Sequence, residues 1–273
     1  MKHHVPLIVK RSMQYSFSII SGASAIAGLW GYTVRDICRD FAWWLWLLIL
    51  FGVFLFFFGV IFLIIRAYRH RSFSTTINGK PVIIKVGDLF SETGWKLIPC
   101  NERFDTVVDD CVIVHDTLNG KFIDKYVNDF DELNKVIEES HNDTSTLKAK
   151  KDGDKTIYPL GRIIPYKDFM MLAFSHFDEQ NTAYVGFEEY EQLLIRMWRE
   201  MRRVYAAKHI AIPLIGSGIT DIRGLSEKNY TELLKCILCT LKRSKFQPNK
   251  GITIILTSEV MDNINMNLIR EEF

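Results

Sequence analysis

The segment HIAIPLIGSGI, residues 209–219, indicates how the chain folds. Its first seven residues are almost continuously apolar, which is typical of a strand buried on both faces of a sheet. The strand pattern runs directly into Gly216 and Gly218. Glycines at the end of a strand let backbone N–H groups approach an anion such as a diphosphate. A tight turn between a strand and a helix explains the same glycines equally well, so the segment alone leaves both interpretations open.

Two amphipathic helices flank this strand. Apolar residues recur at helical spacing over residues 190–205 and again over residues 230–241. A second buried-strand pattern, GITIILT at residues 251–257, follows the second helix. Alternating helices and fully apolar strands predict a central sheet covered on both faces, which is a three-layer α/β/α domain.

The residues before this unit continue the same pattern. They predict strands at residues 81–86, 95–99 and 169–174, a helix at residues 128–139, and an exposed loop or hairpin at residues 141–157. Polar residues follow the first two strands, Asp88 after one and Asn101 after the other. Open α/β sheets bind ligands at the carboxyl edge of their strands, where a carboxylate can accept a hydrogen bond from an adenine amino group. For each residue alone, a capping or turn role is the simpler interpretation.

Residues 1–71 have a different composition. Residues 15–34 and 41–65 contain no charged side chain. At about 1.5 Å per helical residue, each run reaches about 30 Å, the thickness of a bilayer core. We therefore expect an N-terminal two-helix transmembrane hairpin at residues 1–71, with spans at about 12–34 and 41–65, and a folded domain at residues 72–273. Ala23-Ser24-Ala25 also matches a signal-peptide cleavage site, so cleavage of the first span stays open.

The basic residues around the hairpin predict its orientation. Lys and Arg lie before the first run and after the second, and residues 35–40 between the runs are neutral overall. The positive-inside rule then places both termini in the cytoplasm, with the two spans in the cell inner membrane and in contact with lipid. Ser24, Ala27, Gly28 and Gly31 form a small-residue face in the first run, which favours close helix packing and a homo-oligomer.

Charge and cysteine content exclude several functions. The chain has 34 Lys and Arg against 32 Asp and Glu, but residues 1–71 hold eight basic and two acidic residues. Residues 72–273 are therefore mildly acidic, which argues against nucleic-acid binding. Cys236 and Cys239 have CxxC spacing but lie inside the second predicted helix without a second pair. We expect a structural role for them, and neither a metal nor a cofactor.

Three short segments in this order resemble a macro domain, the ADP-ribose-binding α/β fold: VGDL at 86–89, IPCN at 98–101 and PLIGSGI at 213–219. FDTVVDD at 104–110 and TLNGKFI at 117–123 resemble a narrower branch, the membrane-anchored macro-domain effectors of the bacterial Thoeris anti-phage defence systems. In that family a TIR-domain enzyme makes an ADP-ribose derivative, which is histidine-linked in the membrane-anchored branch. The macro domain binds it, and the effector then disrupts the membrane or arrests growth.

The resemblance implies a role for each part of the site. Asp88 would hold adenine, residues 216–219 would surround the diphosphate, and Asn101, Phe104, Asp105, Asn119 and Gly120 would line the distal ribose and its substituent. The full ligand-binding set that the resemblance implies is Asp88, Leu89, Asn101, Phe104, Asp105, Thr106, Asn119, Gly120, Gly216, Ser217, Gly218 and Ile219.

One departure bears on catalysis. Hydrolytic macro domains carry an Asn-Ala-Ala-Asn run followed by a glycine triplet, whereas Asn101 is followed here by Glu102-Arg103-Phe104. We therefore expect a ligand-gated effector without catalysis. Two alternatives stay open: a membrane-tethered ADP-ribosyl hydrolase, in which Asp105 or Asp109 would activate water, and a membrane scaffold for a protein partner.

Overall fold

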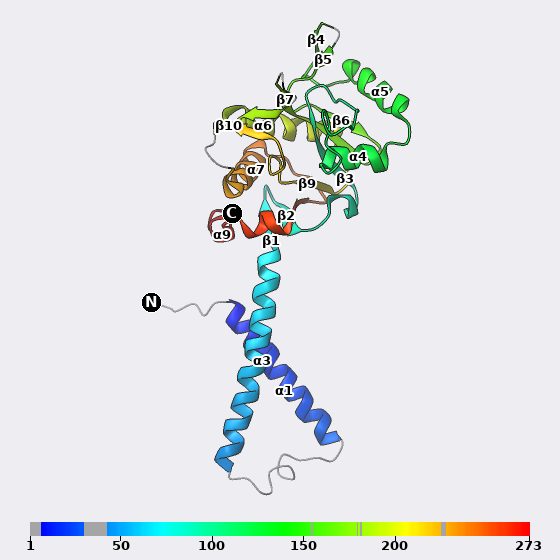
Figure 1. Cartoon of the computed structure of the whole chain (residues 1–273). Helices are drawn as coiled ribbons and strands as arrows, with labels where there is room; N and C mark the ends of the chain where they lie inside the picture. Colours follow the sequence, from blue (N-terminus) through cyan, green and yellow to red (C-terminus); the bar gives the residue numbers. More distant parts are fainter. Residues whose placement is uncertain (1–6, 30–42, 154, 179, 181, 225–227) are drawn as a thin grey trace. The chain divides into compact units, whose positions relative to one another are not determined.

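The chain divides into two compact units, Met1–Arg71 and Ser72–Phe273. The structure is a computed structural model, and it describes residues 7–29, 43–153, 155–178, 180, 182–224 and 228–273. Figure 1 labels the helices and strands of both units.

The first unit consists of two helices, α1 (Leu7–Leu29) and α3 (Trp43–Arg71). They contact one another, and the rings of Phe17 and Phe54 lie 5.0 Å apart between centroids. Serines in α1 return hydrogen bonds to the helix backbone, as Ser16 Oγ does to the Ser12 carbonyl at 2.7 Å. Large apolar side chains are nevertheless exposed on both helices.

The predicted transmembrane hairpin is wrong. Across the residues that the structure describes, no helix combines the length and the apolar character needed to cross a membrane. This finding contradicts the two predicted spans and the inner-membrane localisation with both termini cytoplasmic, and nothing in the structure shows the predicted contact with lipid. The prediction counted uncharged runs of sequence, whereas the helices extend beyond those runs: α1 includes Lys10 and Arg11, and α3 continues through Arg66 to Arg71. The predicted turn at residues 35–40, together with Gly31, lies outside the described residues.

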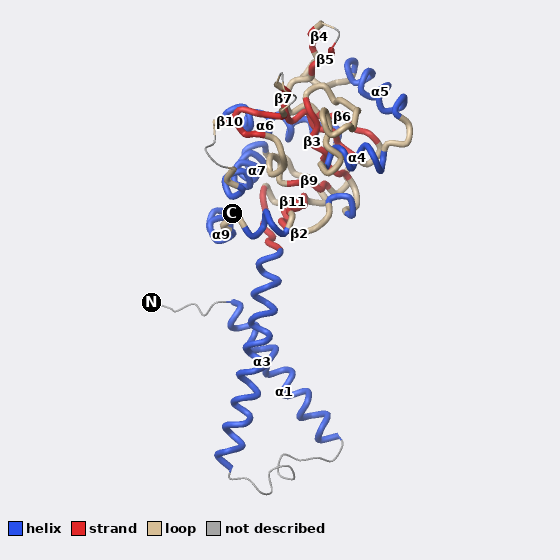
Figure 2. The backbone as a smooth tube through the Cα atoms, in the orientation of Figure 1, coloured by secondary structure: helices blue, strands red, loops and turns tan. Residues whose placement is uncertain are grey.

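The second unit is built on a nine-stranded sheet, drawn in red in Figure 2, with the order β1-β2-β11-β9-β3-β7-β8-β10 and with β6 beside β7. The strands of this sheet are β1 (Ser72–Ile77), β2 (Lys80–Val86), β3 (Trp95–Asn101), β6 (Ile163–Tyr166), β7 (Phe169–Phe177), β8 (Ala183–Gly186), β9 (Ile210–Pro213), β10 (Asp221–Arg223) and β11 (Ile252–Leu256). A separate hairpin comprises β4 (Lys150–Asp152) and β5 (Lys155–Ile157), within the predicted exposed segment.

Five neighbouring strands of the sheet are parallel. β11 pairs in parallel with β2 and with β9, and β3 pairs in parallel with β9 and with β7. Their carboxyl ends consequently lie along one edge of the sheet. The loops after β2, β3 and β9, where the sequence places its polar and glycine residues, all leave from this edge.

Helices cover both faces of the sheet, which confirms the predicted three-layer α/β domain (Figure 1). On one face α6 and α7 bury Leu193, Trp198 and Leu234 against strand residues such as Leu97 and Ile212. On the other face α4 and α5 pack Phe122 and Leu133 against Ile98 and Met171. The helices and short 3₁₀ turns of this unit are η1 (Leu89–Ser91), α4 (Leu118–Tyr126), α5 (Phe130–Glu139), η2 (Ser140–Asn142), α6 (Phe187–Val204), α7 (Tyr230–Ser244), α8 (Ser258–Asp262) and α9 (Met266–Glu272).

Residues 66–71 belong to α3, and β1 follows at once and pairs antiparallel with β2. The hairpin turns at Asn78 and Gly79, whose φ angles of 53° and 74° suit a two-residue turn with both positions left-handed. Asn78 also donates hydrogen bonds to the carbonyls of Leu241 and Phe246, which fixes the hairpin to the end of α7.

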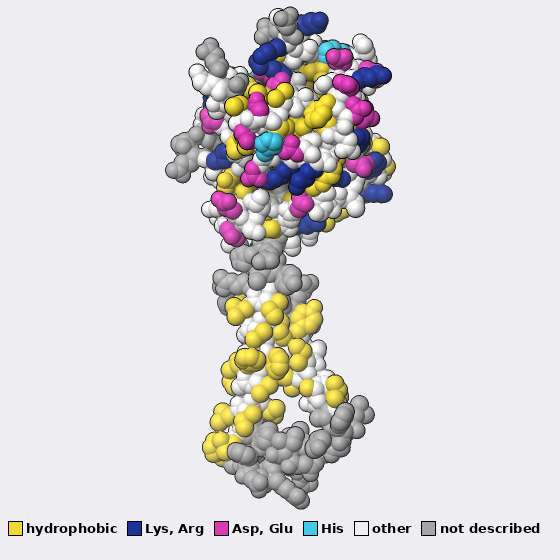
Figure 3. Space-filling view, turned by 45° about the vertical axis from the view of Figure 1, so that its right-hand side comes forward, with side chains coloured by type: hydrophobic (Ala, Val, Ile, Leu, Met, Phe, Trp, Pro, Cys, Tyr) yellow, Lys and Arg dark blue, Asp and Glu magenta, His cyan; other side chains and the backbone are white. Residues whose placement is uncertain are grey.

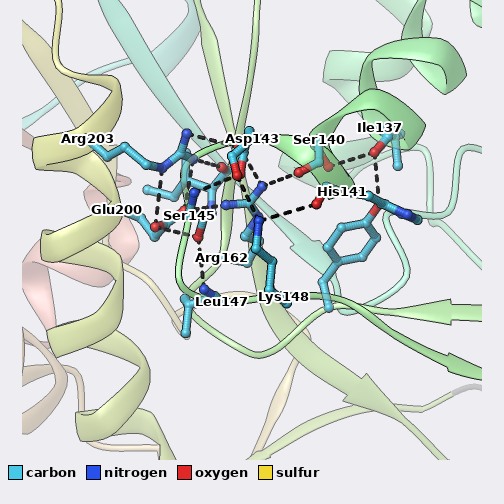
Figure 4. A network of polar contacts seen from close by, with 12 residues as sticks. Ile137, Ser140, His141, Asp143, Ser145, Leu147, Lys148, Arg162, Glu200 and Arg203 are labelled. Carbon is cyan, nitrogen blue, oxygen red and sulfur yellow. Dashed lines mark hydrogen bonds and ion pairs between the residues drawn. The ribbon is translucent and has the colours of Figure 1, made fainter.

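A buried ionic network ties the loop after α5 to α6 (Figure 4). The Arg162 side chain is 1% exposed and donates to Glu200 Oε2 at 2.9 Å, to Asp143 Oδ2 at 2.6 Å and to the Ser140 carbonyl at 2.9 Å. Arg203 bridges the same two carboxylates, at 2.9 Å from Glu200 and 3.0 Å from Asp143. Ser145 donates to the other Glu200 oxygen at 2.8 Å. Three side chains outside the loop, those of Arg162, Glu200 and Arg203, thus hold the loop at Ser140, Asp143 and Ser145.

Replacing Glu200 by Met (E200M) should strongly destabilise this unit, because Arg162 would stay buried with Asp143 as its remaining carboxylate partner. We expect the free energy of unfolding to fall by about 3–5 kcal/mol. The matched control is E139M, which removes the exposed pair between Lys135 and Glu139 and should cost less than about 1 kcal/mol. Urea denaturation followed by tryptophan fluorescence measures both. Equal losses in the two variants would contradict a structural role for the network.

Candidate functional site

The carboxyl edge of the parallel strands brings together most of the predicted site residues. Asp88 follows β2, Asn101 ends β3, and residues 214–219 follow β9. Neighbouring strands hold these loops together, since Gly87 N–H donates to the Leu256 carbonyl at 3.1 Å and Leu214 N–H donates to the Ile255 carbonyl at 3.3 Å. On the face of the unit that Figure 3 shows, acidic and basic side chains are intermixed.

Asp88 caps the short turn η1. Its carboxylate accepts from Phe90 N–H at 3.1 Å and from Ser91 Oγ at 2.8 Å. The carboxylate is also exposed, so its remaining lone pairs can accept a further donor. Leu89, which was predicted beside it, is buried in the core and cannot reach a ligand with its side chain without rearrangement.

Asn101 builds the loop that follows β3. Its Oδ1 accepts from the N–H groups of Arg103 at 3.0 Å and Asp105 at 3.2 Å, and its Nδ2 donates to Asp105 Oδ2 at 2.9 Å. A single buried amide therefore closes a five-residue turn and fixes the Asp105 carboxylate. An amide has two N–H donors and a carboxylate has several lone pairs, so the pair can bind a further polar group without opening the turn.

Phe104 occupies the centre of this turn and points inward. It has a φ of 54°, which is unusual for a bulky residue, and its ring packs edge-on against Tyr158 at 5.0 Å between centroids. Because its side chain is buried, Phe104 shapes the loop from within. Thr106 is half-buried just beyond the turn.

Asn119 and Gly120 lie in the first turn of α4. The Thr117 hydroxyl caps this helix by accepting from Gly120 N–H at 3.0 Å, so both residues belong to a capped helix start. A Cβ at Gly120 would meet the carbonyl oxygen of Val114, which requires glycine there. Asn119 Oδ1 contacts the buried Cys100 thiol at 3.4 Å, and burial raises the pKa of that thiol.

The two glycines after β9 differ in kind. Gly216 is buried with a φ of 87°, and a Cβ there would lie 2.8 Å from Ile222 Cδ1, so this position requires glycine for folding. Gly218 is exposed and a Cβ there would meet nothing within 4 Å.

The other residues of this loop differ in exposure and bonding. Ser217 Oγ donates to the Leu214 carbonyl at 2.7 Å. The Ile219 side chain is 68% exposed, which is unusual for a large apolar side chain. The Lys228 ammonium donates to the carbonyls of Gly218 and Thr220.

A pocket of about 180 Å³ opens beside Asp105. Its walls come from the Asn101 turn, the end of α5 and the β4–β5 hairpin, and its lining residues are Arg103, Asp105, Ile137, Glu138, His141, Lys155, Thr156 and Tyr158. The Tyr158 hydroxyl lies 2.6 Å from His141 Nε2 and donates to the Ile137 carbonyl at 2.9 Å. Burial raises the pKa of Tyr158, so the phenol stays neutral. Charges of both signs thus surround the pocket.

His176 lies at the end of β7 between two carboxylates. Its Nδ1 is 2.6 Å from Glu102 Oε2, and its Nε2 is 3.1 Å from Glu189 Oε2. Hydrogen bonding to Glu102 is the main cause that raises the pKa of His176 from 6.5 to about 8. The imidazole is therefore mostly protonated at neutral pH and bonds to both carboxylates.

Apart from Asp105, the pocket residues and His176 were not predicted from the sequence. Arg103, His141, Lys155 and Tyr158 are dispersed over 56 positions and share no motif, so only the fold assembles them. Among the described residues no group of acidic, histidine or cysteine side chains is arranged to hold a metal ion. Cys236 is buried in α7, and burial raises its pKa to about 11, so this thiol stays protonated at neutral pH.

Comparison with known families identifies the domain. The family model described as Thoeris protein ThsA, Macro domain, matches residues 82–257.

The chain belongs to the Thoeris ThsA macro-domain family.

A relative with the same name supports the assignment. The Thoeris protein ThsA of Bacillus amyloliquefaciens (strain Y2) is 35% identical over 216 residues, which cover 76% of this chain and 72% of the relative. The matched residues 82–257 of the macro domain include every predicted binding residue, from Asp88 to Ile219.

Solved macrodomains of Oceanobacillus iheyensis are more distant. A variant of that macrodomain with ADPR is 16% identical, covers 74% of this chain and 98% of that one, and has a TM-score of 0.47. The macrodomain with ADP is also 16% identical, covers 73% and 97%, and has a TM-score of 0.43. The family assignment does not depend on them.

Exchanging the partners of the Asn101 turn tests its geometry. In the wild type Asn101 Nδ2 donates to the Asp105 carboxylate, whereas in N101D two carboxylates would face each other at this point. We therefore expect the free energy of unfolding at pH 7 to fall by about 1–3 kcal/mol. The double variant N101D/D105N restores one donor and one acceptor in exchanged positions and should recover most of the loss. Chemical denaturation of the single and double variants measures this coupling. Additive losses would show that the two side chains do not depend on one another.

Proposed function

We propose that the chain is a non-catalytic effector of a bacterial anti-phage defence system, and that its macro domain binds an ADP-ribose-derived signal. The observation that carries the proposal is the exposed loop of Gly218 and Ile219 at the carboxyl edge of the parallel sheet. This loop offers backbone to a diphosphate without a Cβ in the way, and it lies at the edge where such sheets bind ligands. The family assignment supports the same ligand class.

Each end of the ligand has a partner on this edge. The exposed Asp88 carboxylate can accept from the adenine amino group while it caps η1. The Ile219 side chain is 68% exposed, so contact with a base or ribose would remove its apolar surface from water and favour binding. Beyond the diphosphate, the Asn101–Asp105 pair presents an amide and a carboxylate to the hydroxyls of the distal ribose.

The pocket beside Asp105 supports a substituent on the distal ribose. Arg103 and Lys155 supply positive charge, and Asp105 and Glu138 supply negative charge, around about 180 Å³. Such a lining complements a zwitterionic amino-acid group, as in a histidine-linked ADP-ribose. In this proposal a TIR-domain enzyme produces the signal.

The carboxylates that a hydrolase would use are engaged in structure. Asp109 accepts from the N–H groups of Val112 at 2.7 Å and Cys111 at 2.9 Å, and these bonds lower its pKa, which makes it a weak base. Asp105 is held by Asn101 in the turn. These contacts favour binding over turnover and disfavour the alternative of an ADP-ribosyl hydrolase.

The effector output is proposed to be growth arrest through self-association. The described parts of α1 and α3 expose many large apolar side chains, among them Phe51, Phe56 and Leu63. Exposed apolar surface of this extent favours packing against a second copy of the chain. The second alternative, a scaffold for a protein partner, needs no small-molecule site, so a ligand-binding measurement tests it.

Substitution at Gly218 tests the diphosphate site. Calorimetric titration of the chain with ADP-ribose and with its histidine conjugate should show binding of both, more tightly for the conjugate. Affinity should fall from wild type to G218A to G218V, with Kd at least about tenfold higher in G218V, because a larger side chain keeps the diphosphate from the backbone. A Cβ at position 218 would meet nothing within 4 Å, so G218A and G218V should have the melting temperature of the wild type.

Three results would contradict the proposal. If neither compound binds the folded wild type, the chain is not an ADP-ribose-type receptor and the scaffold alternative gains. Equal affinity in G218V and wild type would show that the glycine only makes a turn. Release of free ADP-ribose from an ADP-ribosylated peptide by the purified chain would establish the hydrolase alternative.

Asp88 is tested by a paired change in protein and ligand. In D88N the amide can still cap η1, but it lacks the carboxylate that accepts from the adenine amino group. We expect D88N to weaken ADP-ribose binding by about 1–3 kcal/mol. The hypoxanthine analogue, which lacks the amino group, should bind wild type and D88N with similar affinity. A D88N loss that is the same for both ligands would mean that Asp88 acts on the loop and not on the base.

A further inference from the structure

His176 joins two segments that belong to different parts of the candidate site. Glu102 comes from the turn after β3, and Glu189 comes from the first turn of α6. The Glu102 and His176 side chains are 11% and 27% exposed, and Glu189 is 38% exposed. The imidazole is thus the bridge between the Asn101 turn and α6.

The Glu102 side of the bridge is rigidly connected to the ribose end of the site. Glu102 N–H donates to the Ser175 carbonyl at 2.9 Å, and the Glu102 carbonyl accepts from Tyr158 N–H at 2.8 Å. Glu102 also lies between Asn101 and Arg103 in the chain. The Asn101 side chain accepts a hydrogen bond from the Arg103 N–H group, which closes the turn around Glu102. A displacement of Glu102 therefore moves the Asp105 carboxylate and the wall of the pocket.

The Glu189 side is connected to the diphosphate end. The next residue, Tyr190, is fully buried, and its hydroxyl donates to the Ile215 carbonyl at 2.8 Å. A Cβ at Gly216 would lie 3.6 Å from the same ring. The first turn of α6 therefore sets the position of the glycine loop.

We propose that His176 is a positioning residue whose protonated imidazole holds the ribose turn and the diphosphate loop in the arrangement that binds ligand. The inference rests on the proposed function and adds a dependence of that binding on proton concentration. No contact between His176 and the ligand is required.

Protonation matters because of the number of donors. An imidazolium has two N–H groups and bonds to both carboxylates, whereas the neutral ring has one N–H and turns a lone pair toward the other carboxylate. Besides Glu102 and Glu189, the nearby charged and titratable groups come from β8 and β10. The ring centroid of Tyr184 in β8 lies 5.5 Å from that of His176. Arg223 of β10 stacks on the Tyr184 ring and forms an ion pair with Asp178.

The sign of the effect follows from the raised pKa of His176. The bridge is complete below about pH 6.5, the ordinary value, and is lost as pH rises through about 8. Ligand affinity should fall over the same range. Linkage is reciprocal, so ligand binding should in turn raise the pKa of the imidazole further.

Titration of the full chain with ADP-ribose between pH 6.5 and 9.5 tests the inference. The diphosphate is fully ionised over this range, so the ligand charge does not change. In wild type we expect Kd to rise by about fivefold or more with a midpoint near pH 8, a typical size for coupled sites. H176Q, which cannot change charge, should bind more weakly at pH 7 and show a flat profile.

Two variants complete the design. H209Q is the matched control, because His209 bonds to the Lys250 carbonyl and to Thr253 at the opposite edge of the sheet; it should keep the wild-type profile. E189Q leaves the Glu102–His176 bond in place and should reduce the pH dependence even if H176Q does not fold. NMR titration of the His176 ring should show its pKa near 8 and an increase when ADP-ribose is added.

The outcomes separate the inference from the proposed function. Absence of ADP-ribose binding at every pH would overturn the proposed function and the inference together. Binding with the same Kd from pH 6.5 to 9.5, or a wild-type profile in both H176Q and E189Q, would overturn the inference alone. An unchanged His176 pKa upon saturation with ADP-ribose would also overturn it, because reciprocal coupling is then absent.

Discussion

The parallel hydrogen-bonding of five strands is the constraint on which the rest of the structure depends. β2, β11, β9, β3 and β7 run in one direction, so the residues that follow them all lie at one edge. Segments more than a hundred positions apart, such as those of Asp88 and Gly218, are brought to the same edge of the sheet by this register, where they form the candidate site. Burial of both sheet faces under helices fixes the register, because a slip by one residue would turn apolar side chains of one face toward the other.

Within this edge, polar groups form the turns and leave specific atoms for a ligand. Asn101 closes its turn with three hydrogen bonds, Asp88 caps η1, and Ser217 bonds to its own loop. Each predicted capping or turn role is therefore present, and it does not compete with binding, since a preformed site loses less entropy when the ligand arrives. The Arg162–Glu200 network adds to this order, because Arg162 also holds the carbonyl of Ser140, the residue before the pocket residue His141.

The N-terminal unit shows the limit of counting charges along a sequence. The uncharged runs at residues 15–34 and 41–65 predicted membrane spans, but the described helices begin and end elsewhere and include basic residues. The strand β1 was not predicted, although the sequence contains its signals. Asn78-Gly79 is a strong hairpin signal, and the exposure of residues 72–77 alternates along the strand.

The sequence by itself determined the α/β class, the two long helices α6 and α7, the buried strands between them, and the macro-domain likeness. Those features depend on periodicity and on short local segments, which are complete within the residues that carry them. Only the tertiary structure decided that Leu89 and Phe104 face the core, and that a side chain would be excluded at the buried Gly216 but not at the exposed Gly218. It alone joined Glu102, His176 and Glu189, and it alone formed the pocket beside Asp105. Such contacts connect residues distant in sequence, so no local pattern specifies them; the packing of strands and helices does.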